Sequence, residues 1–390
     1  MMTFRFLTHI DMVAGNGLFR TIPAFLRERR FQKPAFLVDA GFARSSLWLE
    51  VEKLLRAEFG KDFWFHLNPG AAEPTYDSLR DTLQVFRKNI HDVIVGVGGG
   101  SCMDTAKAVA ALQTNHGDPL DYRGFDKLQV PGVPTVLVPT TAGTGSEAAF
   151  NASFVDLKSN RKMGINGRYM FPTWAMLDGE ATVTCPYGPA LSAGVDALVH
   201  TLEGFACKQR NPMSDMLVRK AFTLLVNALP SLKTDPKNLT HRLDLLLGAH
   251  LGGMIQMNSG SGVAAAISYP LSVYYKVPHG IGGGMFCPDV IKFNIDAGFT
   301  LYSELAPLIG LGSSDASAET KARLVLSHIK NLWHILEVPS KLSVFGIGPE
   351  QFDNVLKVMG TQQAAFDQNP VPFTIEEHLA IFLKPFILNG

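Results

Sequence analysis

The sequence predicts a protein of two domains, an α/β domain built on a parallel sheet followed by an all-α domain. Strand-like and helix-like segments alternate over the first half of the chain, which is typical of a parallel sheet covered on both faces. From about Tyr187 the strand signal fades and long helical periodicities dominate. The chain has 390 residues and is 46% hydrophobic, which is enough for two cores. We place the boundary near Pro186, between residues 1–186 and 187–390.

Short apolar runs predict the strands of the first domain, because strands buried on both faces read as continuous hydrophobic segments. They cover residues 35–38, 63–67, 92–97, 135–138 and 173–177. Helices are expected between them over 47–59, 75–88 and 103–112. In the second domain, apolar residues at helical spacing predict helices over 190–207, 214–229, 243–257, 318–336 and 349–359.

The overall composition argues against several classes of function. The formal net charge is zero and the isoelectric point is about 7.2, so nothing indicates a nucleic-acid or membrane-surface partner. No apolar run reaches the ~18–20 residues that a membrane span needs. The N-terminal residues lack the apolar region and cleavage site of a signal peptide. Because the four cysteines form no CxxC pair, we expect reduced thiols in a cytoplasmic protein.

A glycine-rich turn follows the strand predicted over 92–97. Gly98, Gly99 and Gly100 would let backbone N–H groups approach a phosphate, at a helix N-terminus that favours negative charge. Ser101 is predicted to cap this helix, with Asp104 three residues later in the place of a capping-box partner. The segment is not the GxGxxG fingerprint, and a tight structural turn would explain it nearly as well.

A second polar turn, PTTAGTGSE over residues 139–147, follows the strand predicted over 135–138. Two such turns at strand C-termini in one α/β domain favour a nucleotide site. Asp39 ends the first predicted strand, where a carboxylate can accept from ribose hydroxyls and repel a 2′-phosphate. The same aspartate could equally cap a helix.

Asp196 and His200 are four residues apart, which places a carboxylate and an imidazole on one face of a helix. His279 lies downstream in a predicted turn between Pro278 and Gly280. One carboxylate and two imidazoles are a suitable ligand set for a divalent transition metal. An Asp/His pair at this spacing is, however, more often only a hydrogen bond.

Four segments together resemble the iron-containing (group III) alcohol dehydrogenase family. They are GGGSCMDTAK at 98–107, PTTAGTGSE at 139–147, GVDALVH at 194–200 and VPHG at 277–280. The segments come in the family's order and at its spacing. This resemblance implies a nucleotide-binding α/β domain, a helical domain and a cleft between them that holds NAD(P) and a divalent metal, iron or zinc.

The resemblance also assigns roles to residues by position. It implies metal ligation by Asp196, His200 and His279. Lys162 resembles the family lysine near the nicotinamide, although a solvated surface lysine would look the same. We predict two groups of cofactor-binding residues. The group around the pyrophosphate and ribose consists of Asp39, Gly98, Gly99, Gly100, Ser101 and Asp104. The group beside the nicotinamide ribose consists of Thr140, Thr141 and Thr144.

The chain departs from the family pattern before VPHG. Where the family has a further metal-binding histidine this chain has Ala265, and where it has a second histidine this chain has Tyr269. Three protein ligands still suffice for a catalytic zinc-type site, so we expect the metal to be retained. A substrate with two oxygens could chelate at the open position. Tyr269 is a candidate for moving a proton, or only a packing aromatic.

The function expected from the resemblance is NAD-dependent interconversion of an alcohol and an aldehyde or ketone, by a homodimer. A polar or sugar-acid substrate is one expectation, as in the 3-deoxy-octulosonate 8-oxidases of the family. Three alternatives stay open: a metal-independent reductase of the same fold, a catalytically silent nucleotide-binding protein, and a cyclase on the related dehydroquinate-synthase architecture.

Overall fold

The computed structural model describes residues 3–69 and 73–388, and the chain divides into two compact units. The first unit, called here the sheet unit, comprises residues 8–190 and 235–253. The second, called the helical unit, comprises the remaining described residues, namely 3–7, 191–234 and 254–388. Within residues 3–69 and 73–388, every helix falls short of either the length or the apolar character that a membrane span requires.

The sheet unit contains a six-stranded sheet in the order β1-β9-β6-β4-β2-β3, with every pairing parallel. Its strands are β1 (Asp11–Ala14), β2 (Pro34–Asp39), β3 (Trp64–Asn68), β4 (Val93–Gly98), β6 (Thr135–Pro139) and β9 (Trp174–Leu177). The central strands β2, β4 and β6 are almost entirely buried, which is why they read as apolar runs in the sequence. The carboxyl ends of β4 and β6 meet, because Gly98 pairs with Pro139.

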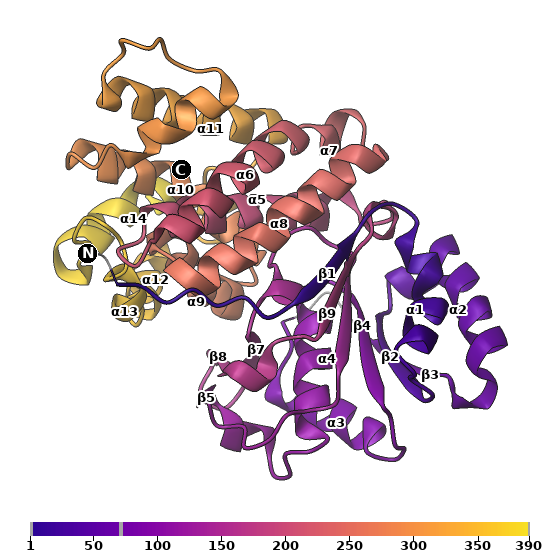
Figure 1. Ribbon diagram of the computed structural model, residues 1–390. Helices are drawn as coiled ribbons and strands as arrows, with labels where there is room; N and C mark the ends of the chain where they lie inside the picture. Colours follow the sequence, from indigo (N-terminus) through magenta and orange to yellow (C-terminus); the bar gives the residue numbers. More distant parts are fainter. Residues whose placement is uncertain (1–2, 70–72, 389–390) are drawn as a thin grey trace. The chain divides into compact units, whose positions relative to one another are not determined.

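Two hydrophobic cores lie on opposite faces of this sheet. Side chains alternate along β2, so Phe36 and Val38 join one core while Ala35 and Leu37 join the other. The first core is completed by α1 (Ile22–Glu28) and α2 (Ser46–Phe59), and the second by α3 (Tyr76–Phe86) and α4 (Gly100–Leu112). Figure 1 shows these helix pairs on either side of the strands.

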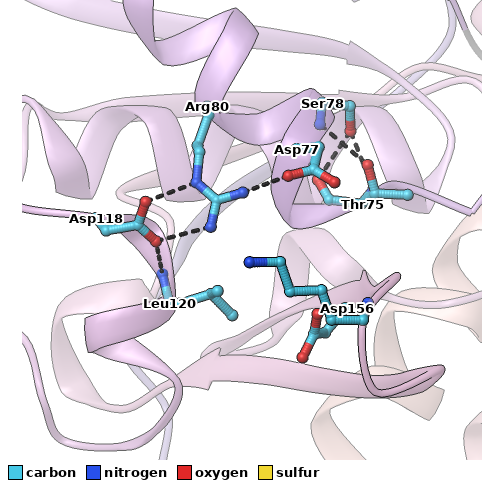
Figure 2. Close-up of polar contacts among 8 residues, drawn as sticks. Thr75, Asp77, Ser78, Arg80, Asp118, Leu120 and Asp156 are labelled. Atoms are coloured by element: carbon cyan, nitrogen blue, oxygen red, sulfur yellow. Dashed lines mark hydrogen bonds and ion pairs between the residues drawn. The ribbon is translucent and has the colours of Figure 1, made fainter.

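An ion-pair cluster anchors the beginning of α3 (Figure 2). Thr75 caps the helix and forms a capping box with Ser78. Arg80 donates from Nε and Nη2 to both oxygens of Asp118, at 2.6 and 2.9 Å, and also pairs with Asp77. The bidentate contact ties α3 to the 3₁₀ turn that follows Asp118.

A small second sheet was not predicted from the sequence. It has the order β5-β8-β7, formed by Gly124–Phe125, Arg161–Asn166 and Asn151–Asp156. These strands carry Asn, Ser, Gly and charged residues, so neither an apolar run nor a strict alternation marks them.

No strand follows β9 in the described part of the chain. The later helices are α5 (Tyr187–Ala206), α6 (Pro212–Ala228), α7 (Ser231–Thr234), α8 (Leu239–Ser259), α9 (Val263–Tyr275), α10 (His279–Asp296), α11 (Ala318–Leu336), α12 (Phe352–Met359), α13 (Gln363–Phe366) and α14 (Ala380–Ile387). The predicted fold class, a parallel α/β half followed by a helical half, is therefore confirmed. The boundary near Pro186 stays a prediction.

Helices α9 and α10 were absent from the predicted elements, and the expected turn around His279 is wrong. His279 is the first residue of α10, with Pro278 as its N-cap. Pro270 lies inside α9 and Pro288 inside α10, which hides both helices because proline normally ends one. Burial against neighbouring helices overrides this preference.

Candidate active site

Helix α5 supplies the first two side chains of a buried polar cluster. Asp196 and His200 lie one turn apart on α5, as the spacing predicts, and their side chains are only 8% and 4% exposed. The distance from Asp196 Oδ1 to His200 Nε2 is 3.5 Å. The other ring nitrogen of His200, Nδ1, is buried and has no hydrogen-bond partner among the described residues.

A close approach of two helices brings His279 to this pair. A Cβ atom on Gly280 would lie 1.9 Å from the backbone oxygen of Ser192 and 2.8 Å from Cβ of Asp196. Only glycine therefore lets the first turn of α10 reach α5. As a result His279 Nε2 lies 3.9 Å from Asp196 Oδ1.

The structure brings together the three residues that the sequence proposed as metal ligands. One ligand atom each from Asp196, His200 and His279 lies within 4.8 Å of the others. The 3.5 and 3.9 Å separations are long for hydrogen bonds. Ligand atoms about 2.1 Å from a tetrahedral ion stand about 3.4 Å apart, so the geometry and the chemistry of the donor set fit a divalent transition metal.

Helix α9 borders this group through Ser268 and Tyr269. Ala265 is buried and presents only a methyl group, so it adds no ligand. The ring of Tyr269 lies 4.8 Å from that of His279, centroid to centroid, at an angle of 44°. Ser268 places its hydroxyl oxygen 3.0 Å from His279 Nδ1.

Glu203 is a buried carboxylate that the sequence interpretation missed. It accepts hydrogen bonds from the backbone N–H groups of Gly262, Ala264 and Ala265, at 2.9, 2.6 and 3.2 Å, and so satisfies the first turn of α9. Burial raises its pKa to about 7. Glu203 follows His200 by three residues on α5, and this continuation of the polar stripe was the available signal.

The glycine turn after β4 leads directly into α4, but Ser101 is not its cap. The helix begins at Gly100 with Gly99 as N-cap, a residue with no side chain that could bond to the first N–H groups. A Cβ on Gly99 would meet Thr141 Oγ1 at 3.1 Å, and one on Gly100 would meet Thr144 at 2.7 Å. The N–H groups of this helix end and two threonine hydroxyls are thus side by side, a donor set that fits a pyrophosphate.

Asp104 is not a capping-box partner either. Its carboxylate accepts from Ser146 Oγ at 2.6 Å and from the backbone N–H of Ser153 at 2.9 Å, and it lies 3.1 Å from Lys107 Nζ. Lys107 is buried and also donates to the backbone oxygen of Ser146 at 2.9 Å. Burial lowers the pKa of Lys107. These contacts anchor the second loop to α4, so Asp104 holds the loop in place.

Asp39 and Thr140 both lie at the carboxyl edge of the sheet. Asp39 ends β2, and its Oδ1 accepts from the backbone N–H groups of Gly41 and Phe42 at 2.8 and 3.0 Å. These bonds close the turn before the 3₁₀ helix Phe42–Arg44 and use one carboxylate oxygen. The N-cap of that helix is Gly41, so Asp39 is not the helix cap that the sequence left open. Thr140 is buried, and its backbone N–H donates to the carbonyl of Gly98 at 2.9 Å, which joins the two loops.

Lys162 lies on β8 opposite Val155. Its ammonium group is 2.8 Å from Glu73 Oε2, and its side chain is 13% exposed. It is therefore a largely buried partner of a carboxylate and not a solvated surface lysine.

Comparison with known proteins decides the family. Residues 10–179 match the family described as "Iron-containing alcohol dehydrogenase", and residues 190–386 match "Fe-containing alcohol dehydrogenase family, C-terminal". The chain belongs to the iron-containing alcohol dehydrogenases. The predicted family and enzyme class are thus confirmed, and NAD with a divalent metal fits the family as the cofactor set.

Individual relatives match over nearly their whole length. The NAD-dependent methanol dehydrogenase of Bacillus methanolicus is 28% identical over 366 residues, covering 94% of this chain and 95% of the relative. The sulfoacetaldehyde reductase of Bilophila wadsworthia is 28% identical, covering 99% and 100%. A solved 1,3-propanediol oxidoreductase superposes with a TM-score of 0.91 at 25% identity, covering 99% and 100%.

Proposed function

We propose that this member of the family interconverts a small alcohol and its aldehyde, with NAD as hydride carrier and a divalent metal held by Asp196, His200 and His279. The convergence of two buried side chains, Asp196 and His200, with the partly buried His279, one ligand atom each within 4.8 Å of the others, carries the proposal. A cation at this position would act as a Lewis acid on the substrate oxygen, and the nicotinamide supplies the hydride chemistry.

The side chains of the site would bind the metal ion and exclude water from it. The carboxylate of Asp196 would neutralise part of the charge of the ion, and the two imidazoles complete a set of three protein ligands. Burial of Asp196 and His200 keeps this part of the site dry. Iron is the metal named in the family description, and zinc suits the same donor set.

The missing side-chain ligand at Ala265 supports a substrate with two neighbouring oxygens. Three protein ligands leave positions for more than one further donor atom. Relatives include a lactaldehyde reductase of Escherichia coli and the sulfoacetaldehyde reductase, whose names denote small aldehydes with a second polar group. We therefore favour small hydroxylated or anionic aldehydes over sugar acids.

The cofactor is proposed to bind with its pyrophosphate at the start of α4. Support comes from the N–H groups after Gly99 and from the Thr141 and Thr144 hydroxyls beside them. The charge of Asp39 favours NAD over NADP. We propose that Ser101, Asp104 and Thr140 stabilise the two loops of this site without binding the pyrophosphate directly. The carboxylate of Asp104, for example, is already held by Ser146, Ser153 and Lys107.

Roles for Lys162 and Tyr269 stay predictions. Lys162 is held by Glu73, so a role near the nicotinamide would use it as an oriented cation. Tyr269 lies against His279 and is a candidate for moving the alcohol proton. A homodimer in the cytoplasm is also proposed, on the resemblance alone.

One combined experiment tests the function. Freshly purified protein is analysed for iron and zinc, and NADH formation or consumption is then followed with methanol, 1,2-propanediol, lactaldehyde, sulfoacetaldehyde and a sugar acid. Turnover that depends on a near-stoichiometric metal supports the proposal. Turnover that survives complete chelation instead indicates a metal-independent reductase, and NAD binding without turnover indicates a silent nucleotide-binding protein.

A further inference from the structure

Helix α8 lies against the second loop of the sheet unit, residues 139–147. The contact is made within residues 235–253, which belong to the same unit as the loop. A Cβ atom on Gly253 would lie 2.5 Å from the backbone oxygen of Gly145 and 2.9 Å from its Cα. In the other direction, a Cβ on Gly145 would lie 2.7 Å from the carbonyl oxygen of Ala249. The two backbones therefore touch, and glycine on both sides permits this.

The conformation of Gly145 adds to the requirement for glycine. Its φ of +60° lies in the left-handed region, which side chains rarely adopt. Gly145 directly follows Thr144, whose hydroxyl lies beside the start of α4, since a Cβ on Gly100 would meet Thr144 Oγ1 at 2.8 Å. Helix α8 thus touches the loop one residue away from a threonine of the proposed cofactor site.

A buried pair of side chains makes a second contact between α8 and the loop. Glu147 Oε1 lies 3.3 Å from His250 Nδ1, and the two side chains are 2% and 5% exposed. Among the residues that the structure describes, His250 is the hydrogen-bond partner of this carboxylate. His250 precedes Gly253 by three residues, so both lie on the same face of α8. Removal of the imidazole would leave a buried carboxylate without that partner.

Helix α4 holds the same part of the chain. Lys107 donates to the backbone oxygens of Ser146 and Ala149, at 2.9 and 3.3 Å, and Asp104 accepts from Ser146 Oγ at 2.6 Å. Burial lowers the pKa of Lys107, and the carboxylates of Asp104 and Glu147 oppose this shift. Two helices, α4 and α8, therefore determine where the loop lies.

We propose that Gly253 and His250 are positioning residues, which hold the second loop at the distance from the start of α4 that NAD binding requires. The proposal rests on the proposed cofactor site, and both residues act through the loop. A methyl group at position 253 must move from 2.5 Å to the 3.4 Å at which ordinary contact begins, so it would push Gly145 away by about 0.9 Å. Thr144 would move with its neighbour.

Titration calorimetry with NAD tests the proposal on the native protein, Gly253→Ala and His250→Ala. We expect the Kd for NAD to rise about tenfold in each variant, the equivalent of one lost hydrogen bond from the loop. The number of binding sites per chain should stay the same, whereas a variant that is merely part-unfolded would lose sites and keep the native Kd. His250→Asn should stay near the native value, because its amide nitrogen takes about the place of Nδ1.

Hydrogen exchange followed by mass spectrometry reports on the loop in the absence of NAD. The amides of residues 139–150 should exchange faster in Gly253→Ala and His250→Ala than in the native protein. His241→Ala is the matched control, because this histidine also lies on α8 but nine residues earlier, about 13.5 Å along the helix axis. It should match the native protein in both measurements.

Native loop exchange and a native Kd in both variants, or equal changes in His241→Ala, would overturn the positioning role. Lost binding sites with an unchanged Kd would overturn it too. Thr144→Val separates this failure from that of the cofactor site. If Thr144→Val weakens NAD binding and the α8 variants do not, α8 does not position the loop. If none of these variants changes the Kd, the loop is not part of the NAD site, and the proposed cofactor site itself fails.

Discussion

Replacing Gly280 by alanine tests how the active site is assembled, because this glycine lets α10 approach α5. The new Cβ would stand 1.9 Å from the backbone oxygen of Ser192, whereas ordinary van der Waals contact begins at 3.4 Å. The first turn of α10 must therefore retreat by about 1.5 Å, and it takes His279 with it. The two obstructing groups are the backbone oxygen of Ser192 and Cβ of Asp196. Neither is the end of a flexible side chain that could move aside.

The expected cost follows from this displacement. Overpacking against backbone costs about 3 kcal/mol, and the helix propensity of alanine returns up to about 1 kcal/mol, so the net loss of unfolding free energy is about 2 kcal/mol. A shift of about 1 Å in a catalytic group can lower turnover roughly 100-fold. Metal content should fall as well, because His279 no longer reaches Asp196.

The matched control is Gly283→Ala on the same helix. Its Cβ would meet Val199 at 3.6 Å and the carbonyl of Ala264 at 3.7 Å, which are ordinary contacts. Urea unfolding gives the free energies, and elemental analysis gives the metal content. If Gly280→Ala matches the native protein in both, or if Gly283→Ala is as damaging, the close approach at Gly280 does not position His279.

Three further predictions concern other parts of the molecule. Asp39→Asn retains an oxygen for the N–H groups of the turn but loses the negative charge. The ratio of kcat/KM for NAD to that for NADP should therefore fall roughly tenfold, which corresponds to about 1.4 kcal/mol of lost repulsion. An unchanged ratio would contradict the role of Asp39. Glu203→Ala leaves the three N–H groups of α9 without their acceptor and should cost about 3 kcal/mol in urea unfolding, whereas Glu203→Gln, which keeps one oxygen, should cost less. Arg80 lowers the pKa of Asp118. Their pairing therefore stabilises the folded protein at pH values above the unfolded-state pKa of an aspartate, and this stabilisation is lost as the pH falls through the lower folded-state pKa. Both side chains are partly exposed to solvent, which weakens the ion pair. Arg80→Gln should therefore cost only about 0.5 kcal/mol of unfolding free energy at pH 7 and nothing at strongly acidic pH, and equal costs at the two pH values would contradict this role.

Local patterns in the sequence were sufficient for most of the fold. The helix predicted over 318–336 is observed as α11 with the same bounds, because its apolar stripe, serine N-cap and polar outer face all agree. Helices α9 and α10 were not predictable in this way. Their prolines and the glycines at 282–284 oppose helix formation locally, and only packing explains them: a Cβ on Gly284 would lie 2.2 Å from Val195.

The candidate site was predictable to a different extent for each residue. Helical spacing alone pairs Asp196 with His200. The chemistry of an imidazole made His279 a third candidate and the resemblance to a family supported it, but no local spacing places His279 beside the pair. Contacts over long sequence separations determine the rest. Asp104 bonds to Ser146 and not to its own helix end, and no local pattern could indicate that partner.

The central claim is that Asp196, His200 and His279 hold a metal ion that the reaction needs. Elemental analysis of the native protein, His279→Ala and Ala265→His at equal concentration, with activity before and after chelation, tests it most directly. We expect near-stoichiometric metal in the native protein, loss of metal and activity in His279→Ala, and tighter metal binding in Ala265→His, where an imidazole adds a ligand. A native protein that carries no metal and keeps full activity after chelation would contradict the claim.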